Sequence, residues 1–215
     1  MIEVAKRLRW LGVAVLLVVY AVLVHHVNVS GKASALGAAL AVAPVLGVAL
    51  AMACSRNSRQ AGLLLLVGGV LASWQWWAVI AQHAGFLFWI QDVSLMLTLL
   101  VTFGHTLLPG RKPLCVQFAE MLHDGPLEPA HERYAHQVTV AWVAFFGAMA
   151  AISTLLFFFA PLAAWSVFTN FLVLPLVALM FGAEFMVRRR VLSGAASGHV
   201  LDAIRAYLKS SAHPH

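Results

Sequence analysis

Charged residues are scarce in this sequence, and their scarcity excludes an ordinary soluble protein. Asp, Glu, Lys and Arg make up 10% of the 215 residues, whereas they make up about 25% of a typical soluble domain. Hydrophobic residues reach 62%. We therefore predict an integral membrane protein.

Cysteines and catalytic signatures are also few. The two cysteines, Cys54 and Cys115, have no second Cys or His at zinc-finger spacing. There is no G-x-S-x-G elbow, P-loop or dinucleotide fingerprint. About fifty residues are expected outside the membrane, which is too few for a soluble catalytic domain with its own core. We predict no metal and no cofactor, although the chain has 10 histidines.

What the sequence does contain is a series of long apolar runs. A helix of roughly 20 residues crosses the hydrocarbon core of a bilayer, and the runs are continuously apolar rather than alternating, as lipid-spanning helices require. They predict an all-α fold, a polytopic bundle of six transmembrane helices that forms a single integral membrane domain over residues 1–215. The predicted helices are Trp10 to Val27, Ser34 to Ala53, Ala61 to Ala81, Phe86 to Leu107, Val138 to Ala160 and Ala163 to Val187.

The basic residues predict the orientation of these helices, because Lys and Arg near helix ends are retained on the cytoplasmic side. With both termini in the cytoplasm, only Lys32 of the 14 basic residues lies outside. Four tryptophans then gather at the outer surface, where their rings favour the headgroup region: Trp74, Trp76, Trp77 and Trp89.

The longest polar interval runs from Phe103 to Trp142 and includes a predicted cytoplasmic interfacial segment, residues 108–137. Pro113 suits the start of a short amphipathic helix that lies in the interface. Pro129 is expected to open a helix that continues without a break into the fifth span. The remaining residues, 188–215, form a predicted cytoplasmic tail with an amphipathic helix around Val200 to Leu208.

The fourth predicted helix carries an organised set of polar residues. Their spacing of three and four places them on one helix face, which we expect to point inward: Gln91, Ser94, Thr98, Thr102 and His105. Asp92 lies about 100° away from this stripe. An acid in a membrane span should face protein or water, so its partner is expected to be His25, His26 or His83, unless Asp92 lies near enough to the surface to be hydrated.

The sixth predicted helix adds Asn170 and Glu184 to this intramembrane polar set. Glu184 can pair with Arg188 one turn later, which we expect to be its main role.

Three stretches resemble a known family: FGHTLLPGRKPLCVQFAEM, RYAHQVTVAWVAFF and FTNFLVLPLVALMFGAEFMVRRR. They are similar to an uncharacterised family of small bacterial inner-membrane proteins encoded beside aryl-polyene and type II fatty-acid-like biosynthesis genes. The resemblance covers mostly Phe103 to Arg190. At the position of His105 that family usually has Arg. Members are sometimes labelled ketosynthases, but a ketosynthase needs a soluble α/β thiolase fold, which six membrane helices cannot provide.

The resemblance implies an acidic acyl carrier protein as a partner for the basic cytoplasmic face. Orientation alone explains these cations, and anionic headgroups attract them as well, so carrier docking is an additional hypothesis. The candidate binding residues for a carrier or for headgroups are Arg111, Lys112, Arg133, Arg188, Arg189 and Arg190.

Three functions remain open. The first is a non-enzymatic component of a lipid or aryl-polyene assembly pathway that receives or passes an acyl product. The second is a small transporter or channel with a polar route along the fourth helix, Asn170 and Glu184. The third, which we favour least, is an intramembrane acyl-handling enzyme that uses His105, His136 and Glu184.

Overall fold

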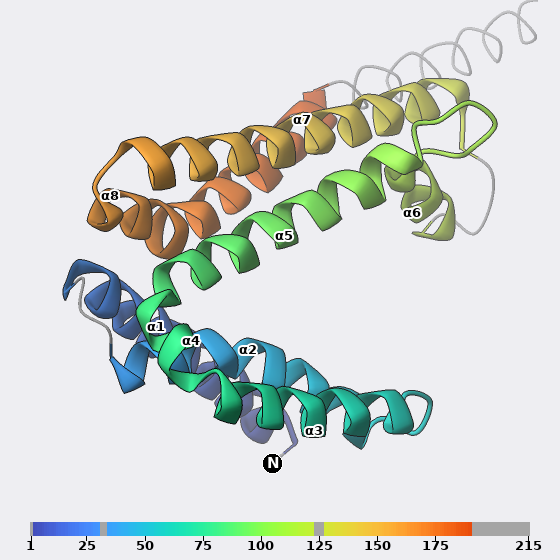
Figure 1. Ribbon diagram of the computed structural model, residues 1–215. Coiled ribbons are helices and arrows are strands. Elements are labelled where there is room, and N and C mark those ends of the chain that lie inside the picture. Colours follow the sequence, from blue (N-terminus) through green and yellow to red (C-terminus); the bar gives the residue numbers. More distant parts are fainter. Residues whose placement is uncertain (1, 31–33, 123–126, 191–215) are drawn as a thin grey trace, which may run out of the picture. The chain divides into compact units, whose positions relative to one another are not determined.

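The computed structural model describes residues 2–30, 34–122 and 127–190, and this part of the chain is helical with no strand. The predicted all-α fold class is confirmed. Lys32, His123 and the tail from residue 191, with its predicted amphipathic helix, lie outside the described residues. The helices are α1 (Ile2–Ser30), α2 (Ala35–Cys54), α3 (Arg59–Gln75), α4 (Trp77–Gln82), α5 (Ala84–His105), α6 (Leu114–Leu122), α7 (Pro129–Phe159), α8 (Leu162–Val167) and the π-helical turn η1 (Phe168–Leu172) (Figure 1).

Five stretches of the described residues are long and apolar enough to cross a membrane, so the chain is a multi-pass membrane protein. They are Leu11–Ser30, Ala35–Cys54, Ala84–His105, Pro129–Phe159 and Leu162–Arg190. The third predicted span is interrupted, because α3 ends at Gln75 after 17 residues and α4 begins at Trp77. Six spans therefore stay a prediction.

The last two long helical stretches differ in regularity. α7 is continuous from Pro129 to Phe159, as predicted. The stretch from Leu162 to Arg190 instead contains the π-helical turn η1 between α8 and the α-helical residues 173–190. Such turns are rare and recur at functional sites, and Asn170 lies within this one.

The chain divides into two compact units. Unit 1 comprises Met1–Leu95 and Ala150–Val173, and unit 2 comprises Met96–Met149 and Leu174–His215. The core of unit 1 brings together α1, α2, the start of α5 and α8, through Val24, Val27, Ala41, Ala84, Phe88 and Trp165.

Unit 2 is held by aromatic packing and by one buried hydroxyl. The Trp142 ring contacts those of Phe103, Phe146 and Phe181, with centroids 6.3, 5.4 and 4.7 Å away. Thr139 is fully buried; its hydroxyl accepts from the Cys115 N–H at 3.2 Å and donates to the Ala135 carbonyl at 3.0 Å. This hydroxyl ties α6 to α7.

α2 and α3 lie side by side in unit 1 and are joined by a short turn (Figure 1). Their backbones approach closely at Gly62, where an added Cβ would lie 2.1 Å from the backbone nitrogen of Ala53. A small residue at the contact point permits this approach, as in other membrane helix pairs.

Pro44 interrupts the hydrogen bonding of α2, and a side chain of the neighbouring α1 compensates. Proline has no N–H for the carbonyl four residues earlier, that of Leu40, and its ring crowds that carbonyl. The Tyr20 hydroxyl from α1 donates to the Leu40 carbonyl at 3.1 Å. The Gln91 amide from α5 donates to the next carbonyl, that of Ala41, at 2.6 Å. Lipid offers no partner for the freed Leu40 carbonyl, so the Tyr20 bond fixes α1 against α2, and the Gln91 bond joins α5 to α2 as well.

This arrangement makes the cost of losing the Tyr20 hydroxyl dependent on Pro44. Tyr20→Phe leaves the Leu40 carbonyl without its donor and should lower the free energy of unfolding by about 1–2 kcal/mol. In a Pro44→Ala background the restored N–H can pair with that carbonyl, so Tyr20→Phe should cost much less. Unfolding in mixed micelles with increasing dodecyl sulfate measures the four proteins of the cycle. Equal losses in both backgrounds would contradict this account of the proline.

Candidate ligand cavity

Unit 1 contains a cavity of about 990 Å³ that is open at the surface, since Val48 and Leu64 of its wall are 62% and 75% exposed. Its volume is at the upper end of the range of roughly 300–1,000 Å³ for small-molecule sites. α1, α2, α3, the first half of α5, α8 and η1 all contribute to its wall, which is mainly aliphatic. Pro44 and Gly68 belong to this wall, and Gly68 has open space where a Cβ would stand. The cavity therefore suits a largely apolar molecule.

Six polar side chains interrupt the apolar wall. They are Tyr20, Gln91, Asp92, Ser94, Thr169 and Asn170. Four of them were predicted to be intramembrane polar or acidic positions, namely Gln91, Asp92, Ser94 and Asn170. These four share the cavity wall.

Asp92 is held by a relay of hydrogen bonds from α7 and α8. The Ser153 hydroxyl donates to Asp92 Oδ2 at 2.5 Å, and the Trp165 indole N–H donates to Ser153 Oγ at 3.0 Å. Ser153 is 1% exposed and so is Trp165. Because both protons point toward the carboxyl group, the two bonds polarise each other in the same direction.

The predicted histidine partners of Asp92 were wrong. His25 Nδ1 is 3.1 Å from Ser166 Oγ, and His83 Nδ1 is 3.0 Å from the Val79 carbonyl of its own helix. His26 is exposed. A serine hydroxyl supplies the hydrogen bond to Asp92 instead, because Ser153 lies opposite Asp92 inside the unit.

A second polar cluster surrounds Ser166, which is fully buried. Its Oγ accepts from the Asn28 and Asn170 side-chain amides at 3.3 and 3.2 Å. With both lone pairs occupied, the remaining contact is a donation from Ser166 to His25. This cluster joins α1 to α8 and η1 beside the cavity residue Asn170.

The prediction that the α5 stripe faces inward was wrong for Thr98, Thr102 and His105, which are exposed, whereas Gln91 and Ser94 line the cavity. The buried residues on this helix include Phe88 and Met96. The reason is local bonding, since the Thr102 hydroxyl donates to the Thr98 carbonyl of the same helix at 2.7 Å. A hydroxyl satisfied in this way does not need a protein neighbour.

Glu184 belongs to unit 2, where its carboxylate lies 3.7 Å from Arg188 Nε, as predicted. The Tyr134 hydroxyl also donates to the Glu184 carbonyl at 2.9 Å and to its carboxylate at 3.3 Å. Glu184 therefore has a structural role, in which it joins α7 to the helical residues 173–190.

The three residues of the predicted enzyme site are not brought together. His105 contacts Arg111, and His136 is exposed. Within the described residues, no contact joins His105, His136 and Glu184.

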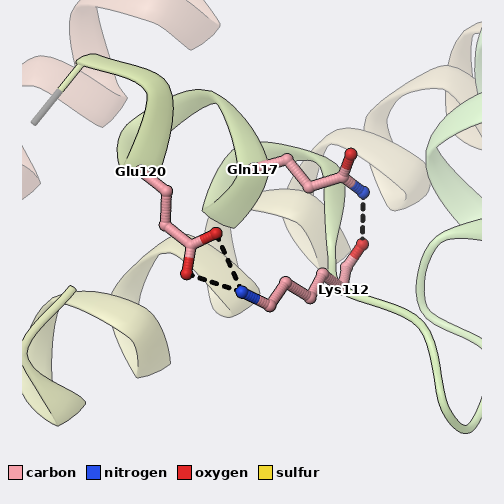
Figure 2. Close-up of polar contacts among 3 residues, drawn as sticks. All are labelled: Lys112, Gln117 and Glu120. Carbon is pink, nitrogen blue, oxygen red and sulfur yellow. Dashed lines mark hydrogen bonds and ion pairs between the residues drawn. The ribbon is translucent and has the colours of Figure 1, made fainter. Parts of the chain in front are cut away.

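The predicted partner-binding cations lie in unit 2, and several have partners inside it. Figure 2 shows Lys112 Nζ between the two carboxylate oxygens of Glu120, at 2.8 and 3.0 Å. This hydrogen bond and the Glu120 charge raise the pKa of Lys112. Arg188 and Arg189 lie 5.7 and 5.8 Å from the centroid of the Phe185 ring. Arg133 donates to the Pro129 carbonyl at 3.4 Å, and both Arg133 and Arg190 are exposed.

Comparison with known proteins identifies no relative. No protein-family model matches the chain, and no curated protein or solved structure shows significant similarity to it. The cavity must therefore be interpreted from its own residues.

The sequence pattern did not predict the residues that complete the two polar clusters at the cavity. Ser153 and Ser166 are single serines in apolar helices, and Tyr20, Asn28 and Trp165 lie near helix ends or among apolar neighbours. Asp92 was the one signal that pointed to them, because a buried acid requires a donor. Among the described residues no group of three or more His, Cys, Asp or Glu side chains is arranged to hold a metal ion.

The relay to Asp92 predicts different effects for two Trp→Phe substitutions. Trp165→Phe removes the donor to Ser153 and should lower the free energy of unfolding by about 1–3 kcal/mol. Trp89→Phe is the matched control, because the Trp89 indole N–H is buried without a hydrogen-bond partner in the described structure. It should cost less than about 1 kcal/mol, since no hydrogen bond is lost.

Dodecyl sulfate titration of both variants in mixed micelles measures this difference. A loss for Trp89→Phe as large as that for Trp165→Phe would show that ring volume, rather than the hydrogen bond, sets the cost.

Proposed function

We propose that this protein is a non-enzymatic component of the bacterial inner membrane that holds a long-chain acyl or polyene molecule in the unit 1 cavity during lipid or aryl-polyene assembly. The observation that carries the proposal is the cavity itself, about 990 Å³ in volume and mainly aliphatic, built by helices that include membrane spans. Apolar walls with a few polar groups are typical of sites for small apolar molecules.

The assignment to this pathway rests on the family resemblance, whose residues are mostly in unit 2. A cavity suited to a hydrocarbon chain is consistent with an acyl or polyene product. Carrier docking stays a prediction, because Lys112 and Arg188 already pair with carboxylates of unit 2.

A channel along the α5 stripe has less support. Thr98 and Thr102 are exposed, and a Thr102 hydroxyl bonded to its own helix does not define a water-lined route.

An enzyme using His105, His136 and Glu184 also has less support, since Glu184 is engaged by Tyr134 and Arg188. Burial raises the pKa of the Cys115 thiol, which disfavours this cysteine as a thiolate nucleophile.

Filling the cavity should displace its occupant. Gly68→Leu places a side chain into the open space beside Gly68, so it should reduce severalfold the amount of long-chain molecule that copurifies with the protein. Gly47→Leu is the matched control, because Gly47 also has open space at its Cβ but does not line the cavity. Lipid extraction and mass spectrometry give the molar ratio, and visible absorption identifies a bound polyene.

Wild-type protein should retain a long-chain molecule beyond the composition of the surrounding membrane lipid. If wild type shows no such enrichment, or if both leucine variants retain it equally, the cavity is not a binding site for such molecules.

A further inference from the structure

In the cavity wall, the hydrogen-bond acceptors that are not bonded to protein atoms outnumber the donors that are not. We infer that the cavity selects a long-chain molecule whose polar end donates a hydrogen bond and carries no negative charge, such as an alcohol. This inference rests on the proposed function of the cavity and specifies the chemical class of its ligand.

Most donors on the wall are already directed at protein atoms. The Tyr20 hydroxyl donates to the Leu40 carbonyl, and the Thr169 hydroxyl donates to the Trp165 carbonyl at 3.3 Å. The Asn170 amide donates to the Ser166 carbonyl at 2.9 Å, to Ser166 Oγ and to Thr169 Oγ1. One N–H of Gln91 goes to the Ala41 carbonyl.

The carbonyl partners also fix the orientation of the two amides. A carbonyl oxygen only accepts, so the nitrogen of Gln91 must face Ala41 and the nitrogen of Asn170 must face Ser166. The amide oxygens of Gln91 and Asn170 therefore point away from these partners and remain acceptors. Asp92 adds a carboxyl group, of which Oδ2 accepts the Ser153 proton.

A ligand in this cavity thus meets an excess of acceptors in an apolar wall. An O–H group can satisfy one of them, whereas an ether of the same length cannot. An anionic head group has few donors to meet and lies close to the carboxyl group of Asp92, and burying a charge without a partner is costly. The cavity therefore discriminates by the donor capacity of the head group as well as by chain length.

Competition for a photoreactive chain tests this selectivity. The full-length protein in nanodiscs of phosphatidylethanolamine and phosphatidylglycerol is labelled with hexadecan-1-ol that carries a mid-chain diazirine, and the labelled peptides are mapped by mass spectrometry. The competitors are hexadecan-1-ol, hexadecyl methyl ether and hexadecane-1-sulfonate. Each is compared at the same mole fraction in the membrane, so that a difference in partitioning into the bilayer is not mistaken for a difference in binding. The alcohol should compete about tenfold better than the ether, as the gain of one hydrogen bond predicts, and the sulfonate should compete least.

Asp92→Asn replaces an acceptor-rich carboxyl with an amide that has its own donors. It should narrow the gap between alcohol and sulfonate severalfold, whereas Val101→Ala, an exposed residue of α5 outside the cavity, should leave the order unchanged. The selectivity of the wild type stands as a test even if Asp92→Asn is unstable.

The outcomes separate the inference from the function on which it rests. Labelling of cavity peptides with equal competition by all three compounds, or with best competition by the sulfonate, would overturn the donor requirement and leave the lipid-binding function in place. Absence of label from cavity peptides would overturn both.

Discussion

Hydrogen bonds that have no alternative in lipid determine how unit 1 is built. Pro44 leaves the Leu40 carbonyl without its partner in α2, and the hydroxyl of Tyr20 takes its place. Gln91 supplies a donor to the adjacent carbonyl of Ala41. Water would satisfy the Leu40 carbonyl in a soluble protein, but in a membrane the protein must do so itself. The packing of α1 against α2 follows from this requirement.

The same requirement gives the cavity its chemical character. Each side-chain donor that is bonded to a backbone carbonyl is no longer available to a ligand, so the wall keeps more acceptors than donors. Asp92 strengthens this bias, and Ser153 and Trp165 offset part of the cost of burying it. Stabilisation of the fold and selection of a ligand are thus two results of one set of bonds.

The helices could be predicted from the sequence because long apolar runs in a chain with few charges have one stable arrangement in lipid. Continuity from Pro129 into the fifth span was correctly predicted from the proline at the helix start. The break at Trp76 and the π-turn at Phe168–Leu172 were not, since each irregularity lies within one predicted apolar run. The positions of the helices along the chain were therefore predictable, whereas the direction in which each side chain points was less predictable.

The residues of α5 show why direction is harder to predict in membrane helices. Hydrophobic periodicity distinguishes inside from outside when the outside is water, but lipid is as apolar as a protein core, so this signal disappears. Small hydroxyl residues add a false signal, because Thr102 satisfies its proton on its own helix and can face either way. Carboxyl and amide groups have more hydrogen-bond donor and acceptor sites than their own helix can satisfy. Asp92 and Gln91 must therefore face protein, and in this chain they, rather than Thr98 and Thr102, mark the inner surface.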